Sequence, residues 1–329
     1  MKRSELISRI LIITGILLAV GTPLYFWKRT PLIHAHMSEE GGWTPDTIRA
    51  KVGEPLQLHF TSDDVMHGFA VGQMDMDAVD IKPGKVTDVS LTFDKSGVYT
   101  FFCTRWCGVN HWRMRGTIEV TGDPSGTEDA SVIIPLYLSL GLDIDAPHET
   151  PNVPDVQPSA IRGKELVSNL NLDHLVEPEL YKSSSPYQIF QQLDPALLSD
   201  PEKWDVVAYI WQTSTTPESI ANGKKLYGQN CAACHGEDGA GDGVFADDIA
   251  AAGEASMQSM SGAMDSMMQT PADFTDRKRM LGASPAVLHG KILRGGMGTG
   301  MPMWGSIFTE QQIWDLVSYL YSFQFEYDK

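Results

Sequence analysis

Two cysteines, a histidine and a methionine lie within twelve positions of the chain, in the segment CTRWCGVNHWRM at residues 103–114. Thiolate and thioether sulfurs are soft ligands that favour Cu(I), and imidazole also suits Cu(II). Because Cys103 and Cys107 are four positions apart, both sulfurs can bridge two coppers, which then share one electron with little change in geometry. The segment therefore predicts a dinuclear copper centre for electron transfer, with His111 and Met114 as further ligands.

A second histidine, His67 in the segment VMHGFAV, lies in an earlier loop that we expect to reach the same end of the fold. A disulfide between the two cysteines and a zinc site are the alternatives. Neither explains why His111 and Met114 follow, and zinc has little use for a thioether ligand. The combination of ligand types favours copper.

The other two cysteines, Cys231 and Cys234, lie in the segment NCAACHGEDGAGDG and are followed directly by His235. A Cys-x-x-Cys-His motif attaches haem c through two thioether bonds, and its histidine supplies an axial ligand of the iron. A redox-active dithiol is the alternative. It does not require His235, and no thioredoxin-like βαβ pattern surrounds the pair. The motif therefore predicts one covalently bound haem c.

The haem iron needs a sixth ligand, and a methionine suits an acceptor of electrons from soluble carriers because His/Met ligation raises the haem potential. The segment GGMGTGMPMWG offers Met297, Met301 and Met303. The residues alone leave the choice among these three open.

Four segments with alternating or β-branched and aromatic residues predict strands around the copper ligands, at residues 56–60, 86–93, 97–103 and 116–120. Short strands at this spacing, separated by turns such as KPGK and DKSG, are typical of a β-sandwich or a Greek-key barrel. The copper segment follows the third strand, so we expect its ligands on a loop at one end of the barrel.

Two helices are predicted to flank the haem motif. The first begins at Thr216, an N-cap followed by proline and glutamate, and runs through Gly223 to the haem cysteines. The second, TEQQIWDLVSYLYSF, opens with Thr309 and Gln312 as a capping box and carries one apolar stripe.

The chain of 329 residues has a formal net charge of −17 at pH 7 and a pI near 4.8. This excess of acid argues against nucleic-acid binding and favours a basic protein partner. The uncharged run from Ile10 to Trp27, about 18 residues, reaches the length that spans hydrocarbon. We predict a retained transmembrane anchor at residues 1–30, with a cleaved signal peptide as the alternative.

The segments HGFAV, PGKVTDVSLTF and GVYTFFCTRWCGVNHWRMRGTIEV resemble the dinuclear copper A domain of cytochrome c oxidase subunit II, in the variety with a single transmembrane helix. The resemblance implies two bridging thiolates and two further ligands for each copper. These are Cys103 and Cys107 as bridges, His67 and Met114 on one copper, and His111 and the backbone carbonyl of Arg105 on the other. Many family members carry a magnesium-binding carboxylate where this chain has Arg105, so that site lacks its carboxylate here.

Residues 215–325 resemble a class I cytochrome c, in which the first and last helices pack against each other. Gly223 would permit that close approach. The distal iron ligand of the family typically precedes a proline, which selects Met301, with Met303 as the alternative.

An internal repeat precedes the predicted cytochrome domain. The segment LSDPEKWDVVAYIWQ at residues 198–212 matches FTEQQIWDLVSYLYS at residues 308–322 position for position, and GKEL at Gly163 echoes GKKL at Gly223. Internal self-similarity usually reflects duplicated units, although two amphipathic helices can share a pattern by chance. We expect a degenerate cytochrome-like segment at residues 155–214, without haem because it has no cysteine.

Two further segments carry no predicted cofactor. Residues 123–154 are rich in proline and acid and are typical of a linker, apart from the apolar SVIIPLYLSLGL, which we expect to pack on a neighbouring domain or subunit. The methionines at residues 257–268 recur at helical spacing and are expected to form a packing face, with a Cu(I)-handling role as the alternative.

The sequence thus predicts a multidomain protein. Its parts are a transmembrane anchor at 1–30, an all-β, cupredoxin-like Greek-key copper A domain at 31–122, a linker at 123–154, a haem-less helical segment at 155–214 and an all-α cytochrome c domain at 215–329.

A copper-binding β-barrel domain followed by a cytochrome c domain resembles subunit II of the cytochrome-c-fused haem-copper oxidases. The resemblance implies an electron-transfer subunit in a bacterial cell membrane, with its N-terminus cytoplasmic and its redox domains on the outer face. A soluble donor, a basic cytochrome c or small copper protein, would pass electrons through haem c and copper A to the oxygen-reducing subunit I. No catalytic residue is expected in this chain. The alternatives are a subunit of a copper-A-containing nitric oxide reductase and a free-standing electron shuttle or copper-assembly factor.

Overall fold

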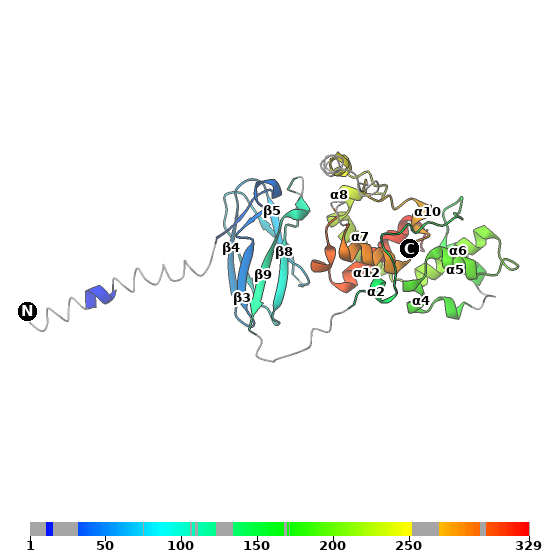
Figure 1. The fold of residues 1–329 in the computed structure, drawn as a ribbon, viewed down its shortest axis with the longest axis horizontal. Coiled ribbons are helices and arrows are strands. Elements are labelled where there is room, and N and C mark those ends of the chain that lie inside the picture. Colours follow the sequence, from blue (N-terminus) through cyan, green and yellow to red (C-terminus); the bar gives the residue numbers. More distant parts are fainter. Residues whose placement is uncertain are drawn as a thin grey trace, which may run out of the picture. The chain divides into compact units, whose positions relative to one another are not determined.

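The computed structural model describes residues 11–15, 32–74, 76–105, 107–108, 111–122, 134–167, 170, 172–251, 270–296 and 301–328. The chain divides into two compact units, within residues 1–126 and 127–329. Figure 1 shows strands in the first unit and helices in the second. Each unit is described by itself below.

The first unit is built from two β-sheets. Its strands, within the described residues, are β1 Leu32–Ala35, β2 Trp43–Thr44, β3 Thr47–Lys51, β4 Leu56–Ser62, β5 His67–Val71, β6 Val79–Ile81, β7 Thr87–Leu91, β8 Gly97–Phe102 and β9 Arg115–Thr121. One sheet has the order β2-β1-β4-β7, and the other has the order β3-β9-β8-β5-β6. The β1–β4 and β3–β9 pairs are parallel, whereas the other pairs are antiparallel.

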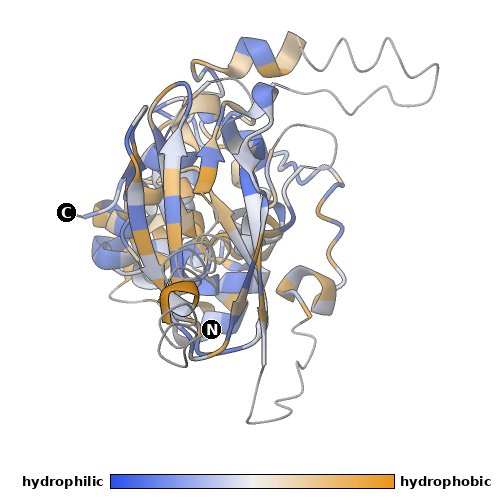
Figure 2. Cartoon of the chain, turned by 90° about the vertical axis from the view of Figure 1, so that its left-hand side faces the viewer, coloured by the Kyte–Doolittle hydropathy of each residue, from blue (hydrophilic) through white to orange (hydrophobic). Residues whose placement is uncertain are grey.

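The four predicted strands are confirmed as β4, β7, β8 and β9. Strands β4, β7 and β9 alternate in sequence because one face of each covers the core while the other meets solvent, whereas β8 is β-branched and aromatic. In β4, for example, Leu58 and Phe60 are buried and Gln57 is exposed. Figure 2 shows the corresponding alternation of apolar and polar residues along the strands.

An aromatic cluster joins the two sheets. The ring of Trp43 lies 5.7 Å from that of Phe60 in one sheet and 5.5 Å from that of Phe101 in the other, centroid to centroid. Phe60 and Phe69 face each other across the sheets at 4.4 Å. Each of these rings is almost fully buried, and burying such a side chain contributes about 1.5–3 kcal/mol. This core holds the strand ends from which the candidate copper ligands project.

The second unit is helical. Its helices in the described ranges are α2 Leu136–Ser139, α3 Ala160–Leu166, α4 Pro178–Ser183, α5 Pro186–Gln192, α6 Asp200–Thr213, α7 Pro217–Asn230, α8 Ala232–His235, α10 Arg277–Met280, α11 Pro285–Arg294 and α12 Glu310–Leu320. The two helices predicted to flank the haem motif are α7 and α12. Both begin as expected, because Thr216 accepts a hydrogen bond from Ser219 N and Thr309 forms a capping box with Gln312.

Helices α7 and α12 cross at Gly223. A Cβ atom on Gly223 would lie 2.0 Å from the carbonyl oxygen of Asp315 and 2.8 Å from Cβ of Tyr319, so only glycine fits there. Ser219 on α7 adds a hydrogen bond of 2.6 Å to the carboxylate of Asp315. The close approach of the first and last helices that the sequence predicted is therefore present.

Helices α3 and α6 cross at Gly163 in the same way. A Cβ atom there would lie 2.0 Å from the carbonyl oxygen of Asp205 and 2.9 Å from Cβ of Tyr209. The repeat in the sequence pairs these three residues with Gly223, Asp315 and Tyr319. The two crossings thus match in both sequence and geometry.

The described part of the predicted linker is packed against the helices. Tyr137 on α2 lies against Gly290 of α11, Ile144 is buried, and Asp145 receives two hydrogen bonds from Arg294, of 2.5 and 2.6 Å. Residues 134–154 therefore belong to the second unit rather than standing free of it.

The predicted anchor falls mostly outside the described residues, since only residues 11–15 of the segment 1–30 are described. Among the helices that the structure describes, none has both the length and the apolar character to cross a membrane. The methionine-rich segment 257–268 also lies outside the described residues.

Candidate metal centres

The thiols of Cys103 and Cys107 lie side by side in the first unit, with a separation of 3.9 Å between their sulfurs. Neither is in a disulfide, and both are buried. The thioether sulfur of Met114 lies 3.9 Å from the sulfur of Cys107. Three sulfur atoms thus share one buried pocket, as a soft metal ion requires.

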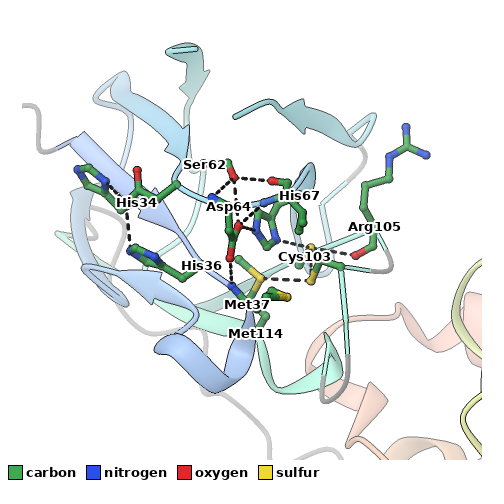
Figure 3. Close-up of polar contacts among 12 residues, drawn as sticks. His34, His36, Met37, Ser62, Asp64, His67, Cys103, Arg105 and Met114 are labelled. Carbon is green, nitrogen blue, oxygen red and sulfur yellow. Dashed lines mark hydrogen bonds and ion pairs between the residues drawn. The ribbon is translucent and has the colours of Figure 1, made fainter. Parts of the chain in front are cut away.

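Two imidazoles and one carbonyl complete this group. Nδ1 of His67 lies 3.7 Å from the sulfur of Cys103, and Nδ1 of His111 lies 3.5 Å from the sulfur of Cys107. The carbonyl oxygen of Arg105 lies 3.2 Å from the sulfur of Cys103. All six groups named from the sequence are therefore brought together, and Figure 3 labels four of them, His67, Cys103, Arg105 and Met114.

The strands explain why these residues meet. Cys103 follows β8, and its amide donates to the carbonyl of Met114, which precedes β9. Gly68 in β5 lies so close to this loop that a Cβ atom would be 2.0 Å from the hydroxyl of Thr104. The amide of Gly68 also points at the sulfur of Cys103, 3.4 Å away.

The position of His67 differs from the expectation, because it is the first residue of β5 rather than part of a loop. It is fully buried, and its Nε2 lies 2.7 Å from the carboxylate of Asp64. A carboxylate can only accept this hydrogen bond, so Nε2 carries the proton and the lone pair of Nδ1 faces the sulfurs. Asp64 thereby orients a candidate copper ligand.

Sequence reasoning did not identify Asp64. Its other hydrogen bonds come from the amides of Met37 and Val65, both at 2.6 Å. Burial opposes ionisation, but these hydrogen bonds and that of His67 hold the pKa of Asp64 below its usual value. The only signal in the sequence is the pair of aspartates shortly before His67 in SDDVMH.

The two thiols ionise unequally, because the hydrogen bond with Cys103 and burial raise the pKa of Cys107. The hydrogen bond shared with Cys107 lowers the pKa of Cys103 far below that of a free thiol, in spite of burial. Burial lowers the pKa of His67, but its hydrogen bonds with Cys103 and Asp64 outweigh this and raise it. A thiolate is the form that binds copper.

The side chain of Arg105 points away from the sulfurs and pairs with Asp80, at 2.8 Å from Nη2. This leaves only its carbonyl for the metal centre.

The second candidate centre is the Cys-x-x-Cys-His motif at the end of α7. Cys231 is the C-cap of α7, and Cys234 and His235 lie on the short helix α8. Burial raises the pKa of the Cys231 thiol to about 12 and that of the Cys234 thiol to about 11. Both thiols are therefore protonated at neutral pH.

His235 is oriented for metal binding. Its Nδ1 lies 3.0 Å from the carbonyl of Ala272, and its ring stacks on Phe274 at 4.7 Å. Because a carbonyl can only accept, Nδ1 carries the proton and Nε2 keeps its lone pair. Burial lowers the pKa of His235, which keeps the ring neutral. The motif therefore fits haem c, and the carbonyl of Ala272 is a contact that the sequence did not reveal.

Of the three methionines offered as the sixth iron ligand, Met297 lies outside the described residues. Met301 is partly buried, and its carbonyl accepts a hydrogen bond from Gly296. The side chain of Met303 is 55% exposed. An axial ligand must be shielded, so this difference favours Met301.

The fold and the donor set of the first unit define a cupredoxin-like copper domain, and the motif of the second unit defines a c-type cytochrome. Residues 45–121 match the sequence family "Cytochrome C oxidase subunit II, periplasmic domain". Residues 220–324 match the family "Cytochrome c". The chain thus joins a subunit II domain to a cytochrome c domain.

Curated relatives of this chain are named cytochrome c oxidase subunit 2. Two cytochrome c oxidase subunit 2 sequences from Thermus thermophilus are 38% identical to this chain over 79 residues, which is 24% of this chain and 58% and 46% of those proteins. The chain thus spans about half the length of these relatives. The solved periplasmic domain of subunit II of cytochrome oxidase from Bradyrhizobium japonicum is 20% identical and covers 29% of this chain and 84% of its own, with a TM-score of 0.24.

Proposed function

We propose that this chain is the electron-transfer subunit II of a haem-copper oxidase. It would take electrons from a soluble donor through haem c to dinuclear copper A, and deliver them to the oxygen-reducing subunit I. One observation carries the proposal: two thiols, two imidazoles and a thioether converge in a domain of the subunit II family, in a chain that also has a haem-attachment motif. A copper-assembly factor would need no haem.

At the copper site, the protein would hold the ligands in fixed positions. The bridging candidates Cys103 and Cys107 and the candidate Met114 are each at most 7% exposed, so water is kept from the centre. Copper bound there would supply one-electron transfer with little change in ligand geometry. Asp64 fixes the ring of His67, and β8 and β9 fix the cysteine loop.

At the haem site, Cys231 and Cys234 would form the two thioether bonds and His235 would present Nε2 to the iron. Met301 is the proposed axial ligand on the other side. Haem c bound in this way would accept and release single electrons at a raised potential.

The proposed partners are inferred from the net charge of the chain and from the subunit II family. A net charge of −17 favours a basic donor, a cytochrome c or a small copper protein, because opposite charges accelerate encounter. We place the chain in a bacterial cell membrane, with an anchor at 1–30, its N-terminus in the cytoplasm and both redox domains on the outer face.

The test uses the intact complex, purified from membranes through a tag on this chain and supplied with reduced cytochrome c. We expect rapid oxygen uptake, with four electrons consumed per molecule of oxygen. Nitric oxide consumption with little oxygen turnover would instead assign the chain to a nitric oxide reductase.

A variant pair separates the two centres. C231A/C234A is expected to lose the haem absorbance and keep the copper spectrum, whereas C107S is expected to do the reverse. Loss of both centres in either variant would contradict two independently bound cofactors.

A further inference from the structure

We propose that His34, His36 and Asp63 form a second metal site, which binds a divalent transition-metal ion, Zn²⁺ or Cu²⁺. The ligand atoms of the three side chains lie within 4.8 Å of one another. Oδ2 of Asp63 is 2.7 Å from Nδ1 of His34 and 3.3 Å from Nε2 of His36. This site shares no residue with the copper centre, and it does not depend on the proposed function.

The backbone positions these side chains in advance. His34 lies in β1 and His36 follows that strand, so their side chains point to the same face of an extended segment. Figure 3 shows the two rings next to each other, and they stack with 17° between their planes. The amide of Asp63 donates to the carbonyl of Ala35, which fixes the carboxylate beside them. A site on paired strands needs little rearrangement to bind an ion.

The ligand types select the ion. Imidazole and carboxylate suit zinc and copper(II), whereas calcium and magnesium prefer oxygen ligands alone, and copper(I) prefers sulfur. Zinc bonds of about 2.0–2.2 Å in a tetrahedron place neighbouring ligand atoms about 3.3 Å apart, which is the separation between His36 and Asp63. The side chains are 39%, 25% and 41% exposed for His34, His36 and Asp63, so an ion can enter and water can fill a remaining position.

The site lies next to the copper centre along two segments of the chain. Met37 follows His36, Asp64 follows Asp63, and the amide of Met37 donates to Asp64. Asp64 in turn orients the copper ligand His67. An ion held by His36 and Asp63 would therefore stiffen the two segments that support this hydrogen bond.

The test is zinc binding by the full chain, with haem and copper already in place. Zn²⁺ is titrated in competition with a chromophoric chelator, while the absorbance of the copper centre is recorded in the same samples. We expect one zinc per chain with unchanged copper absorbance. The variants H34A, H36A and D63N should each weaken zinc binding about tenfold or more, a loss of about 1.4 kcal/mol.

The same sheet offers a matched control. His59 on β4 pairs with Asp88 on β7, at 2.5 Å, as a partly exposed histidine–carboxylate pair without a second histidine. H59A should leave zinc binding unchanged. The proposal is overturned if the wild-type chain binds no zinc, if H59A weakens binding as much as H36A, or if zinc binds only while copper absorbance is lost.

Discussion

Asp64 connects the candidate copper ligand His67 to the amide of Met37 with a single carboxylate. Such an acceptor fixes the tautomer and the ring orientation of a metal-binding histidine. Its removal should therefore harm the copper site without touching a ligand.

We expect D64A to lower copper affinity about 10–100-fold, the usual effect of losing such a partner. The measurement is copper retention against a chelator, followed by the visible absorbance of the dinuclear centre. D88A, which removes a surface carboxylate from the same unit, is the control. Equal copper retention in D64A and wild type would show that the carboxylate does not position His67.

For Arg105 we expect that loss of the side chain leaves the copper site intact. Its carbonyl lies at the sulfurs, whereas its half-exposed side chain pairs with Asp80. R105A keeps the carbonyl, so the copper spectrum should be unchanged, and the loss of an exposed ion pair should cost at most about 1 kcal/mol of stability. A changed copper spectrum in R105A would mean that the side chain takes part in the centre.

Most residues of the two candidate centres could be named from the sequence because they lie close together in it, whereas His67 and Met301 lie far from the two motifs. Cys103 to Met114 and Cys231 to His235 are each written in one short segment. The contacts that support these residues could not be predicted, because each of them joins segments that are distant in sequence. Met37 reaches Asp64, and the carbonyl of Ala272 reaches His235, across 27 and 37 positions of the chain.

At the scale of elements, the two matching helix crossings are the most specific feature. In each, a glycine lets one helix touch the backbone of the other, at Gly163 on α3 and at Gly223 on α7. We infer that residues 155–214 are a duplicated cytochrome-like unit that kept this crossing and has no haem motif. The crossing should then contribute to stability in both copies.

We expect G163A and G223A each to destabilise the second unit by about 3 kcal/mol, the upper end of what overpacking costs, since the added methyl would meet a backbone carbonyl. G228A is the matched control, because its Cβ atom would meet nothing within 4 Å on the same helix as Gly223. It should raise stability by about 0.5–1 kcal/mol. Denaturant unfolding measures all three. If G163A leaves the free energy of unfolding unchanged, the two crossings do not have equivalent roles.

The strongest strands and the two capped helices were predictable because periodicity and capping are local signals. Strands β1, β2, β3, β5 and β6 were not predicted. Two of them, β2 and β6, are very short, and the parallel pairs β1–β4 and β3–β9 join segments distant in sequence. The packing of residues 134–154 on the helices could not be predicted from the sequence either. Proline and acid are typical of linkers, but here Tyr137 and Ile144 pack against α11.

At the scale of the whole molecule, the chain contains two compact units, each with its own candidate centre. A ligand stabilises only the unit that binds it, by about 2.7 kcal/mol when its concentration is 100 times its Kd. Loss of one cofactor should therefore change the stability of one unit.

We expect removal of copper from the full chain to lower one of two thermal transitions, by about 10 °C or more for a domain of this size. Calorimetry records both transitions, and haem absorbance identifies the second unit, whose midpoint should stay unchanged. A parallel shift of both midpoints would show that the units unfold together.

The last described residues of the second unit pack on the segment that precedes the haem-attachment motif. The amide of Glu326 donates to the carbonyl of Pro158, the amide of Ala160 donates to the carbonyl of Glu326, and Phe325 packs on Trp211. During synthesis, Trp211 can contact Tyr181 at once, but Phe325 follows more than a hundred positions later, roughly 6–23 s at 5–20 residues per second. Cys231 and Cys234 emerge within this interval. The haem-attachment motif is thus made before the C-terminal segment that completes the packing of the second unit.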